Sequence, residues 1–338
     1  MAEMFEAGDV VLQSGHVFPG MQLAYQTYGN LNAARDNVVV YPTSFAAQHH
    51  DTEWVAVPGG ILDTDRWFVV IPNLFGNGLS SSPSNSMDRF SLSNFPRISY
   101  HDAVSVQRRM LQEVFGIERV ALVYGWSMGG MQAYQWAASF RCAVQRVAVV
   151  CGSACCSAYN FVFLEAVKAA LMADPAYRDG AFREPPTAGL RAMGRIYAGW
   201  AMSHPYFRDE LWREAGFDTL EDYLSGSWDR AFARRDANDL MAQIGIWQSG
   251  NIGRTKTFGG DYARAMASIT ADVLLMPGAT DRYFQAADNE AEVPLLTSAR
   301  SVVLRPIPSS HGHRAGNPVN IPADREFLRA EIAQFLSS

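Results

Sequence analysis

Short, continuous runs of apolar residues recur along the chain and alternate with stretches that have helical spacing. The runs lie within residues 37–41, 67–72, 119–124, 146–151, 272–278 and 301–306, most of which also hold a polar residue near one end. Uninterrupted runs of this length are typical of strands that are buried on both faces of a sheet. Two earlier stretches, 10–13 and 22–28, contain β-forming residues and are separated by glycine and proline, so they predict an antiparallel opening pair.

Helical spacing of apolar residues predicts helices over residues 101–115, 128–139 and 324–336. Because buried strands alternate with helices, the sequence predicts an α/β fold with a mostly parallel central sheet and helices on both faces. Residues 73–87 are rich in Gly, Ser and Asn and lack the phosphate-binding glycine patterns, so we expect a surface loop there.

The middle of the chain has a different pattern. Between about residues 160 and 263 no strong strand signal occurs, and helix-like stretches appear instead at 161–172, 188–202, 209–214, 220–224 and 229–247, punctuated by prolines. A helical insertion between sheet strands can cap a pocket. We therefore expect an α/β core formed by residues 1–157 and 266–338, with a helical cap or lid over residues 158–265.

Composition excludes several function classes. The 338 residues are 48% hydrophobic, which allows a sizeable core, and the net charge of −6 argues against binding nucleic acid or an anionic membrane. No apolar run is long enough to span a bilayer, and the N-terminus lacks the residue order of a signal peptide. The four cysteines cluster between residues 142 and 156 and do not suggest a disulfide framework. We expect a cytoplasmic protein without a membrane partner.

The motif that carries chemistry is Gly125-Trp126-Ser127-Met128-Gly129, a G-x-S-x-G pattern between a predicted strand and a predicted helix. In that context the serine sits on a sharp turn as an exposed nucleophile, and the glycines let strand and helix pass closely. The backbone N–H of Met128, at the helix start, can stabilise an oxyanion. The alternative is a glycine-rich turn without chemistry, but the correct flanks and the downstream partners favour the nucleophile.

A serine nucleophile of this kind needs an acid and then a histidine later in the chain. Asp281, just after the run at 272–278, is the candidate acid that would orient the histidine, although it could instead cap a helix. Asp288 is the competitor and is expected to lie within a helix.

The candidate bases are His311 and His313, which follow the last predicted strand. They could also form a His-x-His metal site, but no carboxylate or cysteine pattern completes one, so no metal is expected. The second oxyanion donor should come from the loop after the first central strand, as the backbone N–H of either Ser44 or Phe45.

With these residues in place, the chain resembles the homoserine O-acetyltransferase branch of the α/β-hydrolase superfamily from about residue 10 to 335. The segments that carry the resemblance are Gly125–Gln132 (G-W-S-M-G-G-M-Q), Phe95-Pro96, Asp174-Pro175, Gly189-Leu190 with Arg195, Arg235–Asn238 (R-D-A-N, where the family has F-D-A-N) and Gly312-His313. The resemblance implies an α/β-hydrolase fold with a helical cap. It also implies His313 rather than His311 as the base, and a homodimer through the cap helices.

Two arginines bear on the substrate. The resemblance implies that Arg195 points into the pocket as an anion partner, although it could equally lie on the cap surface. The family usually has an aspartate directly after the catalytic histidine, whereas this chain has Arg314. The reversed charge disfavours a cationic amine, favours an anion, and puts homoserine in doubt as the acceptor.

The sequence therefore predicts a serine acyl-transfer enzyme that acts on a small-molecule acyl substrate and needs no cofactor. Arg314 favours a hydrolase of a small ester, thioester or amide. The alternative is an O-acyltransferase that uses acetyl-CoA and an acceptor other than homoserine, because both share the acyl-serine half-reaction. A non-catalytic ligand receptor is less favoured, since Ser127, Asp281 and His313 are all present. A hydride-transfer enzyme is disfavoured by the absence of a dinucleotide fingerprint.

Overall fold

The computed structural model describes residues 2–86 and 90–337, and within them eight strands form one sheet in the order β1-β2-β4-β3-β5-β6-β9-β10. The strands are β1 (Glu3–Val11), β2 (Val17–Tyr28), β3 (Val38–Val40), β4 (Phe68–Pro72), β5 (Leu122–Trp126), β6 (Arg146–Val150), β9 (Asp272–Met276) and β10 (Ser301–Leu304). Strands β3, β4, β5, β6, β9 and β10 run parallel to one another. Strands β1 and β2 pair antiparallel at one edge, and β2 also pairs antiparallel with β4. The mostly parallel sheet and the opening antiparallel pair are therefore confirmed.

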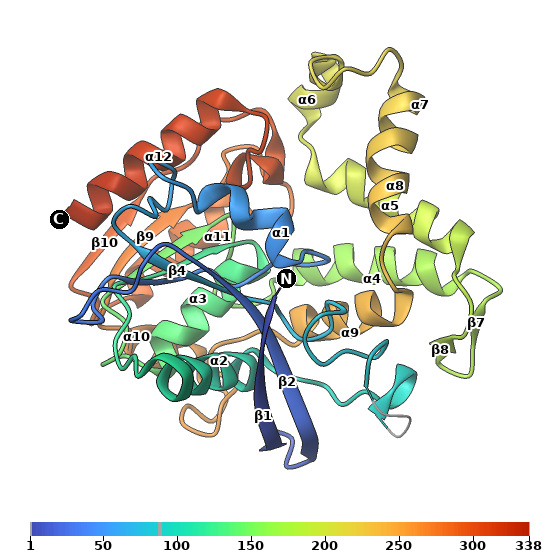
Figure 1. Cartoon of the computed structure of the whole chain (residues 1–338). Helices are drawn as coiled ribbons and strands as arrows, with labels where there is room; N and C mark the ends of the chain where they lie inside the picture. Colours follow the sequence, from blue (N-terminus) through green and yellow to red (C-terminus); the bar gives the residue numbers. More distant parts are fainter. Residues whose placement is uncertain (1, 87–89, 338) are drawn as a thin grey trace.

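Helices cover both faces of this sheet, as predicted. Successive residues of a strand point to opposite faces, so Val38 and Val40 pack in one core with α2 (Tyr100–Phe115) and α3 (Met128–Ser139). Val39 packs in the other core, with Leu328 and Ile332 of α12 (Pro322–Ser337). In Figure 1, α12 and the pair α2 and α3 lie on opposite sides of the sheet. The remaining core helices are α1 (His49–Thr52), α10 (Tyr262–Ala267) and α11 (Ala286–Glu292).

The segment between β6 and β9 is mostly helical, and Figure 1 shows α5 to α8 standing apart from the sheet on the side away from the C-terminus. Its elements are α4 (Ala158–Met172), β7 (Tyr177–Arg178), β8 (Ala181–Phe182), α5 (Thr187–Ala201), α6 (His204–Arg208), α7 (Leu220–Tyr223), α8 (Arg230–Ala233) and α9 (Ala237–Gln248). We call α4 to α9 the insertion helices.

Three details of the insertion differ from the prediction. The strands β7 and β8 form a two-residue antiparallel pair that the sequence did not signal. Residues 209–214 contain a single 3₁₀ turn, Leu211–Arg213, rather than an α-helix. The expected helix over 229–247 is broken before α9 because the Asp236 side chain accepts the N–H groups of Asn238 and Asp239 and caps a new helix.

The glycine- and serine-rich segment 73–86 is not a surface loop, although it was predicted as one, and the last residue of that prediction, Met87, lies outside the described residues. Leu74, Phe75 and Ser80 are fully buried. Polar side chains satisfy the buried backbone: the Asn77 amide donates to the Ala47 carbonyl at 3.0 Å, and the Ser80 hydroxyl donates to the Asn73 carbonyl at 2.7 Å. The abundance of Asn and Ser thus reflects an internal hydrogen-bond network rather than exposure.

Candidate active site

Ser127 stands at the sharp turn between β5 and α3, with φ of 59° and ψ of −126°. A non-glycine residue with positive φ is strained, on the order of 1–3 kcal/mol, and the surrounding structure must hold it in place. The flanking glycines explain how. A Cβ on Gly125 would lie 2.1 Å from the Gly129 carbonyl oxygen, and a Cβ on Gly129 would lie 2.6 Å from the Pro42 carbonyl oxygen. Only glycine fits at either position, and this steric limit explains why the G-x-S-x-G pattern has glycine at both ends.

Asp281 and His313 meet next to this turn. Asp281 follows β9, His313 follows β10, and Asp281 Oδ2 lies 2.6 Å from His313 Nδ1. The other carboxylate oxygen of Asp281 accepts the backbone N–H groups of Tyr283 and Phe284, each at 3.1 Å. These bonds fix the buried carboxylate so that it faces the imidazole.

The remaining ring nitrogen of His313, Nε2, is buried and forms no hydrogen bond with any described residue. The imidazole is packed among the rings of Trp126, Tyr283 and Phe284, with centroid separations of 5.1, 4.4 and 5.6 Å. An imidazole that is anchored through Nδ1 and enclosed on its faces has one nitrogen left for a proton transfer.

The two competing residues lie elsewhere. Asp288 is in the first turn of α11, and the carboxylate that meets His313 is that of Asp281. His311 lies 3.3 Å from the Ser309 hydroxyl and 3.9 Å from the Asp324 carboxylate. Burial lowers the pKa of His311. The two histidines therefore have different partners and do not form a His-x-His pair around one point.

Cys151 is a neighbour of this pair that the sequence analysis did not identify. Its sulfur, the Asp281 carboxylate and a ring nitrogen of His313 lie within 4.8 Å of one another, and all three residues are buried. Burial, together with the Asp281 charge, raises the pKa of the Cys151 thiol well above its ordinary value. A metal ligand must be the thiolate, so the cluster is better suited to a neutral thiol beside an Asp–His pair than to a metal.

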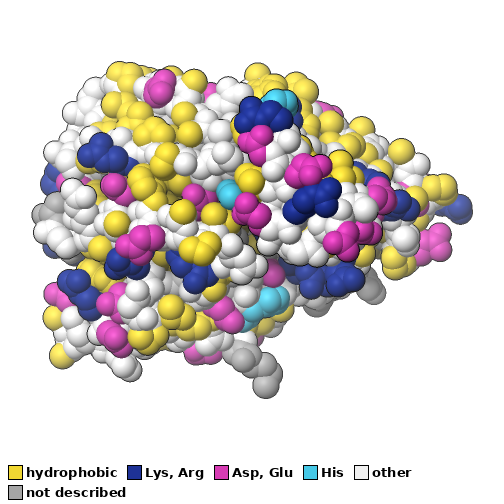
Figure 2. All heavy atoms as spheres, turned by 90° about the horizontal axis from the view of Figure 1, so that it is seen from above, with side chains coloured by type: hydrophobic (Ala, Val, Ile, Leu, Met, Phe, Trp, Pro, Cys, Tyr) yellow, Lys and Arg dark blue, Asp and Glu magenta, His cyan; other side chains and the backbone are white. Residues whose placement is uncertain are grey.

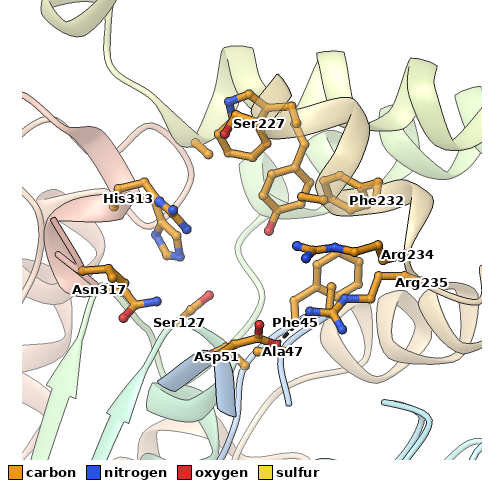
Figure 3. A pocket seen from close by; sticks show the side chains of 18 of the residues that line it. Phe45, Ala47, Asp51, Ser127, Ser227, Phe232, Arg234, Arg235, His313 and Asn317 are labelled. Carbon is orange, nitrogen blue, oxygen red and sulfur yellow. Dashed lines mark hydrogen bonds and ion pairs between the residues drawn. The ribbon is translucent and has the colours of Figure 1, made fainter. Parts of the chain in front are cut away.

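Ser127 and His313 both line a cavity of about 440 Å³. Figure 3 shows their side chains directed into it, with Phe232, Arg234 and Arg235 on the opposite wall. Tyr197 of α5 and Trp228, which precedes α8, also line the cavity. The insertion helices thus form one wall, and the ends of the sheet strands form the other.

Ser44 and Phe45, in the loop after β3, line the same cavity as Ser127, and Met128 directly follows Ser127. The backbone N–H groups of these three residues form no hydrogen bond with another described residue. The Ser44 hydroxyl donates to the Trp126 carbonyl, which ties the loop after β3 to the residue preceding Ser127. Ser44 and Phe45, the two candidates from the sequence, therefore each keep an unpaired backbone N–H in a loop that lines this cavity.

Arg314 and Arg195, the two arginines expected to bind substrate, differ in whether they line the cavity. Arg314 is exposed and lines the cavity. Arg195 does not line it: its guanidinium pairs with Glu221 and, at 3.0 Å, with Asp229. The expectation that Arg195 points into the pocket is therefore not met, because two carboxylates of the insertion hold it. Arg230 and Arg234 line the cavity and were missed, although Arg234 directly precedes the R-D-A-N motif.

Similarity to known proteins defines the fold family of this chain. Residues 37–290 match the family described as alpha/beta hydrolase fold, and the chain belongs to that family. Within residues 2–86 and 90–337 no helix combines the length and apolarity that crossing a membrane requires.

The particular branch follows from the individual relatives. The chain is 32% identical to an ethyl acetate hydrolase of Pseudomonas veronii, covering 99% of this chain and 95% of that one. It is also 32% identical to a homoserine O-succinyltransferase of Methylibium petroleiphilum, covering 90% and 86%. The solved structure of the acetyl esterase MekB superposes with a TM-score of 0.95 at 32% identity, covering 100% and 97%. The chain is thus an α/β-hydrolase-fold enzyme of the branch that contains esterases and homoserine O-acyltransferases, which confirms the resemblance.

Proposed function

We propose that this enzyme hydrolyses small esters, such as acetyl esters, through an acyl-Ser127 intermediate. The observation that carries the proposal is the convergence of Ser127 and the Asp281-bound His313 on one cavity. Two relatives at 32% identity, an ethyl acetate hydrolase and an acetyl esterase, support it.

In the proposed mechanism, Ser127 Oγ attacks the ester carbonyl while His313 Nε2 takes the hydroxyl proton. Asp281 keeps His313 in the correct tautomer and stabilises the imidazolium. The N–H of Met128, with that of Ser44 or Phe45, stabilises the tetrahedral oxyanion. His313 then returns the proton to the leaving alcohol as the C–O bond breaks.

Deacylation repeats these steps with water. His313 takes a proton from water, the hydroxide attacks the acyl carbonyl, and the proton returns to Ser127 Oγ as the acid departs. The exposed side chains of Arg314, Arg234 and Val319 line the cavity, so it is open to solvent. A solvent-open acyl-enzyme favours water over an external acceptor.

The second candidate is an O-acyltransferase that uses acetyl-CoA and an acceptor other than homoserine. The 32% identity to a homoserine O-succinyltransferase supports this candidate. One experiment separates the two. With p-nitrophenyl acetate or ethyl acetate, we expect one acetate per alcohol released, and no acceleration by homoserine or other alcohols. Alcohol release that depends on an acceptor and yields the acetylated acceptor would contradict the hydrolase.

We further propose that residues 158–265 act as a cap over the cavity, and that the chain works in the cytoplasm. The cavity wall contributed by Tyr197, Trp228 and Phe232 supports the first proposal. Four free cysteines, Cys142, Cys151, Cys155 and Cys156, support a reducing compartment.

The insertion helices are also proposed to form a homodimer interface. Tyr159, Phe161 and Val162 of α4 leave 44%, 44% and 59% of their surface exposed, an apolar group that is typical of an interface. We expect size-exclusion chromatography with light scattering to give the mass of a dimer, and Val162→Asp to give a monomer. Val114→Asp on α2, where the valine is 45% exposed, is the matched control and should remain dimeric. A monomeric parent protein would contradict the proposal.

A further inference from the structure

The cavity above Ser127 is lined by an excess of positive charge. Four arginines line it, Arg230, Arg234, Arg235 and Arg314, whereas the one carboxylate among the lining residues belongs to Asp51. Asp51 is already paired, because its Oδ2 lies 2.7 Å from Arg235 Nη2. The other three guanidinium groups have no ion pair with any described residue.

This arrangement contrasts with the rest of the molecule. The chain carries a net charge of −6, and acidic and basic side chains are interspersed over the face shown in Figure 2. Neighbouring insertion arginines are neutralised: Arg195 pairs with Glu221 and Asp229, and Arg191 lies 3.2 Å from Asp229. Unneutralised like charges around one cavity repel one another, and a bound anion relieves that repulsion.

The position of Arg314 indicates which part of the substrate carries the anion. In the proposed mechanism the leaving oxygen must face His313, which protonates it. Arg314 directly follows His313 and lines the same cavity. A negative group on the leaving alcohol or thiol would therefore lie on the side of Arg314. Arg234, which Figure 3 shows directed into the cavity from the opposite wall, adds a second positive charge to the lining.

We propose that the substrate of this enzyme carries an anionic group, a carboxylate or a phosphate, on its leaving-group part, and that Arg314 and Arg234 bind this group. The inference rests on the proposed acyl-Ser127 function and names its substrate class. A guanidinium suits either anion because its N–H groups can bind two oxygens at once.

The first test uses esters that share the acetyl group and differ in charge. These are 4-acetoxybenzoate, which is anionic, and its methyl ester, which is neutral. To test whether the anion is a phosphate, the matched pair is acetyl-CoA and S-acetylpantetheine, which lacks the phosphates of acetyl-CoA. We expect kcat/KM to be about tenfold higher for the anionic member of at least one pair, and the difference to shrink at high salt because the arginines are exposed. The pair that shows the preference identifies the source of the anion. Equal rates, or a preference for the neutral member in both pairs, would overturn the proposal.

Variants assign the preference to residues. Arg314→Gln is expected to lower the anionic-to-neutral ratio of kcat/KM by about tenfold, and Arg234→Gln by a smaller factor. Arg254→Gln is the matched control, because Arg254 is exposed, has no ion pair with a described residue and lies outside this cavity. It should leave the ratio unchanged. A ratio that is unaffected by Arg314→Gln, or that falls equally in the control, would contradict the assignment.

A binding measurement separates this inference from the proposed function. Isothermal titration of the Ser127→Ala variant with 4-hydroxybenzoate and with its methyl ester needs no turnover. If the protein hydrolyses neither ester, the proposed function fails. The anion site is still supported in that case if Ser127→Ala binds 4-hydroxybenzoate more tightly than its methyl ester and the double variant Ser127→Ala/Arg314→Gln does not. If the esters are hydrolysed but the anion has no binding advantage, the inference fails and the proposed function stands.

Discussion

Ser127→Ala is expected to abolish formation of the acyl-enzyme and to lower kcat for p-nitrophenyl acetate by about 10⁴-fold or more. The reason is that an alanine has no oxygen to carry the acyl group, and the proposed oxyanion donors, Met128 with either Ser44 or Phe45, can then stabilise only a direct attack by water. The turn itself should persist, because Gly125 and Gly129 still let β5 and α3 pass closely. Steady-state kinetics and labelling with a fluorophosphonate probe measure both effects.

Ser227→Ala is the matched control, since Ser227 is a second serine that lines the same cavity. It should keep the fluorophosphonate label and the acyl-enzyme. The thermal unfolding midpoint of Ser127→Ala should stay close to that of the parent protein, which would attribute the lost activity to the missing hydroxyl. If Ser127→Ala still accepts the label, the nucleophile is another residue. If the parent protein fails to react at all, the non-catalytic receptor becomes the better hypothesis.

His313→Ala is expected to reduce kcat/KM by at least about a thousandfold, whereas His311→Ala should have a much milder effect. His313 lies 2.6 Å from Asp281 and keeps a free Nε2, so its loss removes the proposed proton acceptor for Ser127. His311 instead lies near Ser309 and Asp324. Its loss should reduce stability rather than chemistry.

The comparison is informative because the two histidines are two residues apart in one turn. Kinetics of both alanine variants on the same ester, together with their unfolding midpoints, distinguish a chemical from a structural role. A severe kinetic loss in His311→Ala with a mild effect in His313→Ala would reverse the assignment of the base.

The sheet and the sharp turn at Ser127 could be predicted from sequence because their signals are local. A strand buried on both faces must be apolar throughout, as 38–41 and 67–72 are. The passage of β5 past α3 leaves no room for a Cβ at Gly125 or Gly129. Asp281 was the candidate acid for a similar reason, its place after a late strand, and the structure pairs it with His313. Choosing His313 over His311 required the family resemblance, since both histidines follow the last strand.

The environment of the arginines was not predictable, because it depends on residues distant in sequence. Arg195 is held by Glu221 and Asp229, which lie 26 and 34 positions away. The pairing of Arg235 with Asp51 spans 184 positions. The burial of segment 73–86 likewise depends on contacts with other parts of the chain, such as that of Asn77 with Ala47. Composition alone could not distinguish its internal hydrogen bonds from exposure to solvent.

The most direct test of the central claim is intact-mass spectrometry of the protein after rapid mixing with p-nitrophenyl acetate, and separately with acetyl-CoA, followed by a chase with water alone or with homoserine and other alcohols. Peptide mapping then locates the acetyl group. We predict one acetyl group on Ser127 that water removes rapidly and that acceptors do not remove faster. An acetyl-Ser127 that persists in water and is discharged only by an acceptor would contradict the hydrolase and establish a transferase, and acetylation at a different residue would contradict the site itself.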